Sequence, residues 1–315
     1  MDQQPQPMLR PRISELIPEF LEHLRTEERS APGTIERYKG NLTRFAAAIG
    51  DCRADEITSE KLSLHKRQLT DRGLSAAGIA TIISSVRSFF RYLRAVKGWQ
   101  TYDPEKIKRP RVPVREVAYL NKVEVRRFLD AIPTRSLAGM RDRALAEILF
   151  ATGMRISEAT SINRIDLDWE AKEARIIGKG NKERRIYFSE GALERLSEYL
   201  RHRTDDHPAL FATQGPEPGR LSPADVWQKF RGYGIRAGLA KRISPHMLRH
   251  TMATTLLANG CPIGHIRTLL GHRQLQTTCR YYLGIISDKE AKAAHEKYLG
   301  YEEGTEKTDG ASVGR

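Results

Sequence analysis

Apolar residues recur every three or four positions over several long stretches of this chain, which is the spacing of amphipathic helices. Residues 13–26, 33–49 and 75–98 carry this spacing in the first part of the sequence. The clearest apolar stripe lies in the last of these stretches and consists of Ile79, Ile82, Ile83, Val86, Phe90 and Leu93. The pattern predicts a small, helical N-terminal domain over residues 1–100.

The helical spacing breaks over residues 101–118, where three prolines and a run of Lys and Arg predict an extended basic linker. It resumes at Asn121, which we expect to cap a helix because Glu124 follows three residues later. We therefore assign a second domain to residues 119–300. The polar, glycine-containing tail over 301–315 is predicted to be disordered.

The second domain combines several helical stretches with one hairpin pattern. One predicted helix ends at Gly153, and another begins with Ser244 as its N-cap and Pro245 as its first residue. Residues 173–188 read as two short strands around a glycine-rich turn. The expected fold class is mainly α with a small β-hairpin or sheet.

The charge of the chain suggests contact with a polyanion. The formal net charge is +14 over 315 residues. On charge alone, a merely solubilising surface remains an equal alternative. Arg87, Arg91 and Arg94 lie together beside the apolar stripe. They form either a solvated basic edge or a row of phosphate contacts, and the basic composition favours the contacts.

The cysteines and the apolar runs suggest a cytoplasmic protein. Cys52, Cys261 and Cys279 are far apart and odd in number, which argues against a disulfide framework and for a reducing compartment. The start of the sequence lacks the apolar core of a signal peptide, and no run approaches the length of a membrane span. We expect no membrane association.

Two motifs resemble a zinc site and a nucleotide-binding phosphate loop, but each lacks part of the pattern. His246 and His250 have the four-residue spacing of a zinc pair, but the glutamate of the HExxH pattern and a third ligand are missing. The stretch "GKGNK" lacks the full spacing of a phosphate loop and lies in the predicted hairpin. Its Lys179 and Lys182 are candidates to reach into a groove or toward one phosphate, against the alternative of a solvated turn.

Further candidate residues follow in a fixed order along the second domain. Arg155 comes just after a glycine break, and Glu158, three residues on, can brace it. Arg249 lies one helical turn after His246, and His272 follows a glycine that ends another helix. Two adjacent tyrosines come nine and ten residues after His272. Each signal is weak alone, and a capping or core role remains the alternative for the histidines.

Taken together, these stretches resemble the tyrosine recombinases, the phage-integrase and Xer-like family. The matching segments are "ATGMRISE", "IIGKGNKER", "SPHMLRHTMATTLL", "LLGHRQLQTT" and the tyrosine that follows, in the family's order over about 120 to 285. The first 100 residues resemble the family's helical core-binding domain through "GTIERY" and "VRSFFRYL". The resemblance implies a two-domain tyrosine recombinase architecture, with a helical DNA-binding domain and an α+β catalytic domain.

The resemblance assigns the charged residues to one phosphodiester. Its transition state carries extra negative charge, and Arg155 and Arg249 can each fork onto the non-bridging oxygens. His272 can hydrogen-bond the same phosphate. With this much positive charge, we expect neither a metal ion nor another cofactor.

The same resemblance assigns the nucleophile and the proton transfers. The register of "TTCRY" selects Tyr281 as the nucleophile and leaves Tyr282 as a packing residue. His246 can accept the tyrosine proton, and Lys179 can protonate the leaving 5′-oxygen.

The implied activity is site-specific recombination of double-stranded DNA through a 3′-phosphotyrosyl intermediate, for integration or excision of a mobile element or for replicon resolution. The family also implies strand exchange through a four-way junction by four protomers on two DNA sites, with a C-terminal helix docked on a neighbour. We expect a cytoplasmic, nucleoid-associated enzyme. Two alternatives remain: a type IB topoisomerase-like enzyme, and a catalytically silent DNA-binding protein of the same fold.

Overall fold

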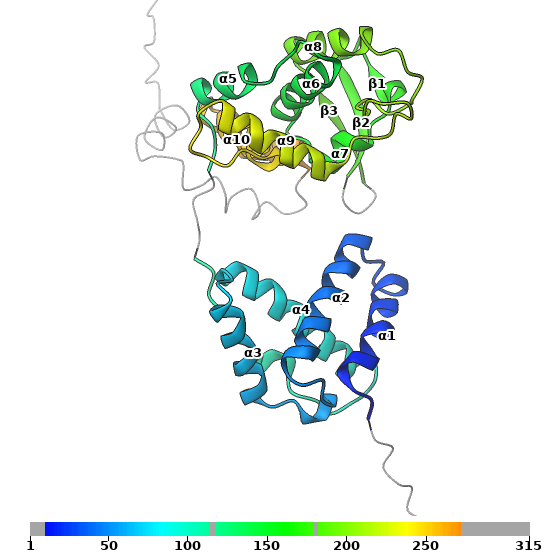
Figure 1. Cartoon of the computed structure of the whole chain (residues 1–315), viewed down its shortest axis with the longest axis vertical. Helices are drawn as coiled ribbons and strands as arrows, with labels where there is room; N and C mark the ends of the chain where they lie inside the picture. Colours follow the sequence, from blue (N-terminus) through cyan, green and yellow to red (C-terminus); the bar gives the residue numbers. More distant parts are fainter. Residues whose placement is uncertain (1–9, 114–117, 179–181, 272–315) are drawn as a thin grey trace, which may run out of the picture. The chain divides into compact units, whose positions relative to one another are not determined.

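The chain divides into two compact units, residues 1–115 and 116–315 (Figure 1). The computed structural model describes residues 10–113, 118–178 and 182–271. In these residues, no helix is both long enough and apolar enough to cross a membrane.

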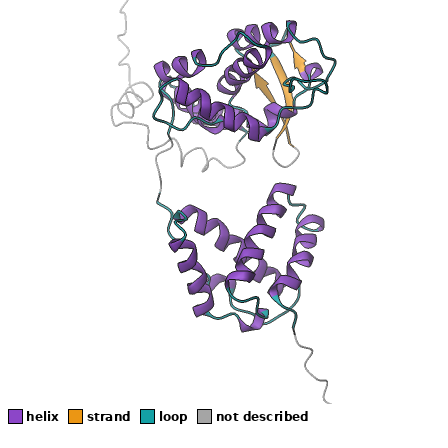
Figure 2. Cartoon of the chain, in the orientation of Figure 1, coloured by secondary structure: helices purple, strands orange, loops and turns teal. Residues whose placement is uncertain are grey.

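The first unit is entirely helical where it is described (Figure 2). Its elements are α1 (Ile13–Thr26), α2 (Pro32–Ala48), the 3-10 turn η1 (Ala54–Glu56), α3 (Ser59–Asp71), α4 (Ala76–Ala95) and the 3-10 turn η2 (Pro104–Lys106). Helix α2 packs against both α1 and α4. The three helices predicted from the apolar spacing are present, and α3 is an addition.

Aromatic rings from three helices meet in the core of this unit. Phe20, Phe45, Phe89 and Phe90 are fully buried. Phe89 meets Phe20 edge-on with ring centroids 5.4 Å apart, a favoured aromatic geometry. The predicted stripe on α4 therefore faces the core, and Phe89 extends it.

Part of the segment predicted to be a linker belongs to this first unit. Ile107 is 1% exposed in the unit's core, and η2 packs against α4. Tyr102, Pro104 and Ile107 pack on the unit, although the basic, proline-rich composition of the segment predicts an extended chain.

The second unit combines helices with a three-stranded antiparallel sheet of order β1-β2-β3. Its elements are α5 (Lys122–Asp130), α6 (Leu137–Thr152), α7 (Ile156–Ser161), the 3-10 turn η3 (Arg164–Asp166), β1 (Leu167–Asp168), β2 (Glu173–Gly178), β3 (Lys182–Tyr187), α8 (Glu190–Arg201), α9 (Pro223–Arg236), α10 (Pro245–Ala258) and α11 (Ile263–Leu270). The predicted fold class, mainly α with a small sheet, is confirmed.

Helix α6 is the centre of this unit. It packs against α8, α10 and β3, and its residues Leu145, Ile148 and Leu149 are fully buried. The three predicted helix ends are confirmed. Asn121 and Ser244 are the N-caps of α5 and α10, and Gly153 ends α6 in the left-handed conformation at φ 60°. A glycine adopts that conformation without steric strain.

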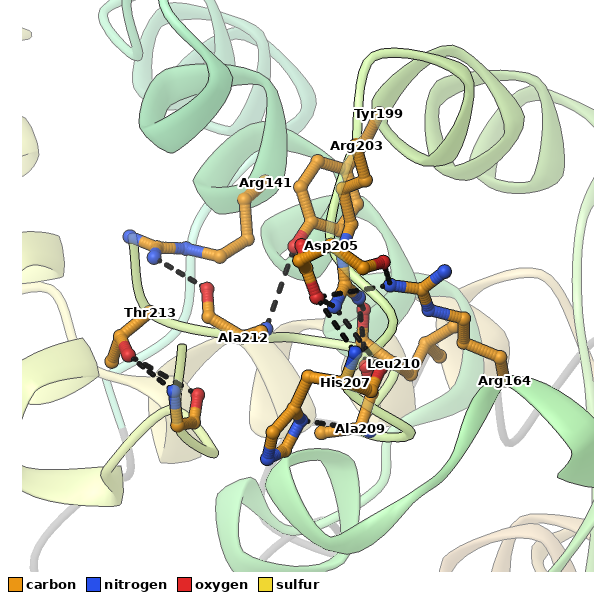
Figure 3. Close-up of polar contacts among 11 residues, drawn as sticks. Arg141, Arg164, Tyr199, Arg203, Asp205, His207, Ala209, Leu210, Ala212 and Thr213 are labelled. Carbon is orange, nitrogen blue, oxygen red and sulfur yellow. Dashed lines mark hydrogen bonds and ion pairs between the residues drawn. The ribbon is translucent and has the colours of Figure 1, made fainter. Parts of the chain in front are cut away.

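Helix α7 has only six residues and depends on tertiary contacts, because so short a helix is marginal alone. The residues that follow it are tied to the loop after α8: Leu210 donates its backbone N–H to the carbonyl oxygen of Ile162 at 2.9 Å. Figure 3 shows how that loop is fastened. Arg203 donates to the carbonyl oxygens of Ala209 and Leu210 and pairs with Asp205. The loop therefore fixes the C-terminal end of α7, which also packs against α6, α9 and β2.

Candidate active site

Arg155 is the N-cap residue of α7 and lies two residues after Gly153, which ends α6. Its backbone N–H donates to Glu158 Oε2 at 2.7 Å, and its side-chain Nη1 donates to Glu158 Oε1 at 2.8 Å. Glu158 is 5% exposed, so the carboxylate is held rigidly within the fold. This acid braces Arg155 through both its backbone and its guanidinium.

A second arginine, Arg184 of β3, binds the same carboxylate. Its Nη1 and Nη2 donate to the two oxygens of Glu158 at 2.8 and 2.9 Å. Burial alone would raise the pKa of Glu158, but the hydrogen bonds from Arg184 and Arg155 outweigh it and lower that pKa below its usual value. The carboxylate therefore stays ionised. Arg184 is the last residue of the matching segment "IIGKGNKER", which assigned it no role, although alternation with buried Ile186 places it on the inward face of the strand.

Arg249 on α10 is 5% exposed and ties two helix ends together. Its Nη1 donates to the carbonyl oxygen of Gly153 at 2.5 Å, and its Nη2 donates to that of Leu270 at 2.6 Å. These carbonyls lie at the C-terminal ends of α6 and α11, where the helix dipole favours a cation. Arg249 thus fixes the turn that leads into Arg155.

His246 lies on the first turn of α10, with its ring 5.8 Å from that of Trp227 in an edge-on contact. Its pKa is lowered by desolvation and by the positive charges of Arg249 and Arg155. Burial also lowers the pKa of His250 to about 4, with help from His246 and Arg249. A neutral His246 at pH 7 can accept a proton, as a general base must.

The structure brings Arg155, Arg249 and His246 together: Arg249 is bonded to Gly153, two residues before Arg155, and His246 lies one turn before Arg249 on α10. Lys182 is the first residue of β3. The other predicted catalytic residues, Lys179, His272 and Tyr281, lie outside the described residues. Within 10–113, 118–178 and 182–271, no group of three or more His, Cys, Asp and Glu residues is arranged to hold a metal ion.

The predicted phosphate contacts of the first unit already have carboxylate partners. Arg87 Nη2 and Arg91 Nη2 lie 2.5 and 2.8 Å from the oxygens of Glu105, and Arg94 Nη1 lies 4.0 Å from Asp103. Glu105 is well exposed, so solvent and salt screen these pairs. The acids of η2 therefore occupy the basic edge of α4.

Comparison with known proteins matches both units. The phage integrase family model matches residues 118–285, and the model of the phage integrase N-terminal SAM-like domain matches residues 17–97. Tyrosine recombinase XerC of Myxococcus xanthus is 31% identical over 280 residues, covering 85% of this chain and 93% of that protein. Tyrosine recombinase XerA of Thermococcus onnurineus is 33% identical over 271 residues, covering 85% and 90%.

Solved structures share the fold at lower identity. The XerH site-specific recombinase bound to palindromic difH substrate in a post-cleavage complex has a TM-score of 0.68 at 22% identity, covering 91% of this chain and 85% of that one. A lambda integrase tetramer bound to a Holliday junction has a TM-score of 0.70 at 18% identity, covering 86% and 77%. With the family models and the relatives in agreement, this chain belongs to the phage integrase family and is a site-specific DNA recombinase of the tyrosine class.

Proposed function

We propose that this enzyme cuts and rejoins duplex DNA through a covalent bond between Tyr281 and a DNA 3′-phosphate. Residues 119–300 carry out the chemistry, and residues 1–100 bind the DNA duplex. The segment 101–118, whose first half packs on the first unit, links the two, and 301–315 form a tail. The enzyme acts where the chromosome lies, in the cytoplasm and at the nucleoid.

The two arginines neutralise the charge that develops on the scissile phosphate. Arg155 and Arg249 bind its non-bridging oxygens, and His272 donates a further hydrogen bond to it. Losing one such donor typically lowers the rate by about 10²–10³-fold. Lys182, at the start of β3, contacts the DNA near the hairpin.

Two proton transfers accompany the change of bonds. The Tyr281 oxygen attacks phosphorus while its proton passes to His246, and the bond between phosphorus and the 5′-oxygen breaks. Lys179 protonates the leaving 5′-oxygen. The new phosphodiester stores the energy of the broken one, so the reverse attack by a 5′-hydroxyl rejoins DNA without ATP.

The observation that best supports this proposal is how the two arginines are anchored. Glu158 holds Arg155, while the carbonyl oxygens of Gly153 and Leu270 hold Arg249. Both act on His246, whose pKa is lowered. Two fixed cations beside a neutral base are what the attack of a tyrosine hydroxyl on a DNA phosphodiester requires.

The test is an assay with two copies of the target site on one supercoiled plasmid. We expect the products of exchange between the sites, and we expect the same yield in excess EDTA because the charge comes from side chains. Relaxation of the plasmid without exchange would instead assign a topoisomerase-like activity. Activity that EDTA abolishes and zinc or magnesium restores would overturn the metal-free chemistry.

We further propose that four protomers assemble on two DNA sites, as the lambda integrase tetramer on its junction suggests. The segment 288–299 is the candidate for docking on a neighbour, with Ala291, Ala294, Tyr298 and Leu299 as its apolar residues. Deleting residues from 288 onward should abolish synapsis while a monomer still binds a half-site. Normal synapsis after the deletion would reject this role.

A further inference from the structure

Arg184 is a cation on the inward face of a strand. Its neighbours Glu183 and Arg185 are exposed, whereas the side chain of Arg184 is only 12% exposed. A charged side chain in such a position is stable only if it is paired. Its partner is Glu158, which lies 26 positions earlier in the chain.

The carboxylate of Glu158 holds two guanidinium groups at once. It accepts four hydrogen bonds of 2.7 to 2.9 Å, two from Arg155 and two from Arg184. One negative charge between two positive charges leaves the trio with a net charge of +1. Without Arg184, the pair of Arg155 and Glu158 would carry no net charge.

Arg184 also contacts the turn that ends α11. A β-carbon built on Gly271 would lie 2.8 Å from Arg184 Cδ, so the arginine stem fills the space that a side chain would need. Gly271 adopts the left-handed conformation at φ 62° and directly precedes His272 in the chain. Arg184 therefore touches both the brace of Arg155 and the residue before His272.

We propose that Arg184 is a positioning residue for DNA cleavage, which offsets the negative charge of Glu158 so that the group around Arg155 keeps a net positive charge facing the scissile phosphate. The inference rests on the role assigned to Arg155 under the proposed function. Arg184 acts through Glu158 and need not touch the DNA. Its fork onto both carboxylate oxygens also fixes the direction in which Arg155 points.

The test measures cleavage of a nicked half-site substrate in a single turnover, at DNA concentrations that saturate the full-length protein. R184M should lower the cleavage rate at least about tenfold, because one charge-assisted hydrogen-bond pair is lost, and should change the half-site Kd less than about threefold. R184K, which keeps the charge, should be intermediate. R185M is the matched control, because Arg185 is the next residue of the same strand and pairs with Glu173 at the surface. The R185M enzyme should cleave at the wild-type rate.

The double variant E158Q/R184M distinguishes charge from structure. It removes the acid as well as its neutralising partner, so Arg155 again carries net charge, and cleavage should recover relative to R184M. A double variant that cleaves no faster than R184M would overturn the proposal. Loss of the folded state in both R184M and R184K, seen in thermal melts, would also overturn it by assigning Arg184 to stability.

A separate arm keeps this inference distinct from the proposed function. R155M should abolish cleavage while half-site binding persists. Cleavage by R155M at the wild-type rate would reject the role of Arg155 itself. An inactive R155M beside a fully active R184M would leave the proposed function standing and reject only the role of Arg184.

Discussion

Arg249 and Gly153 lie 96 positions apart in the chain and are joined by a hydrogen bond of 2.5 Å from Nη1 to the carbonyl oxygen. Gly153 ends α6, and Arg155 begins the next helix two residues later. One predicted catalytic arginine therefore fixes the turn that presents the other. Arg249 therefore has a structural role in the site in addition to the phosphate contact proposed for it.

Replacing Arg249 with Lys should separate charge from geometry. The ammonium group keeps the positive charge but cannot donate in a fork to the carbonyl oxygens of Gly153 and Leu270. We expect cleavage to fall by about 10²-fold or more while half-site affinity changes little. R231K, at an exposed position of α9, is the control and should behave as wild type. An R249K enzyme with normal cleavage would contradict the account.

The pH dependence of cleavage should reflect the depressed pKa of His246. A general base works only when neutral, so activity is lost as the pH falls through that pKa. Because burial and two arginines lower the pKa of His246 from its ordinary value of 6.5, the acid limb should lie below pH 6.5. Rates at subsaturating DNA, with binding measured in parallel, report this limb. A limb centred above pH 6.5 that disappears in H246A would refute the assignment.

His65 should make the first unit sensitive to acid. It is 2% exposed, packs edge-on against Phe45, and has no hydrogen-bond partner at either ring nitrogen. Burial lowers its pKa to about 4, with a further contribution from Arg72. Its contribution to stability is therefore complete above pH 6.5, the ordinary pKa of a histidine in the unfolded chain, and is lost as the pH falls from there to about 4.

The loss amounts to up to about 3 kcal/mol, since one pKa unit corresponds to about 1.4 kcal/mol. Hydrogen exchange of α3 in the full-length protein measures it. H65L should abolish most of the acid-induced increase in exchange. Equal acid sensitivity of H65L and the wild type would show that other groups cause it.

Glu105 should lower the affinity of the first unit for DNA. It pairs with Arg87 and Arg91, so a DNA phosphate must compete with its carboxylate. We expect E105Q to raise the affinity for any duplex several-fold at low salt and to steepen the salt dependence. Replacing Arg87, Arg91 and Arg94 with Ala should weaken binding to all sequences and flatten that dependence. Unchanged affinity and salt slope in both variants would show that this basic edge is a solvated surface that does not contact DNA.

Local chemistry made much of this fold predictable. Ser244, Pro245 and Gly153 are strong helix-end signals, and the stripe on α4 marks its buried face. Helix α3 escaped notice because it buries few side chains, Leu62, His65 and Leu69. A polar sequence with so few apolar positions has too weak a periodicity to reveal a helix.

The site was predictable where its partners are close in sequence. Glu158 lies three residues from Arg155, so their pairing could be expected from helical spacing. Arg184 pairs with the same acid across 26 positions, and Arg249 reaches Gly153 across 96. Such contacts depend on how β3 and α10 pack, which no local pattern encodes.

The central claim is that Tyr281, and not Tyr282, becomes joined to DNA. A nicked substrate that loses its 5′-fragment traps the covalent complex, and peptide mapping by mass spectrometry then identifies the attached residue. We expect the DNA on Tyr281, no adduct with Y281F despite normal binding, and a retained adduct with Y282F. DNA attached to Tyr282, or full cleavage by Y281F, would contradict the account.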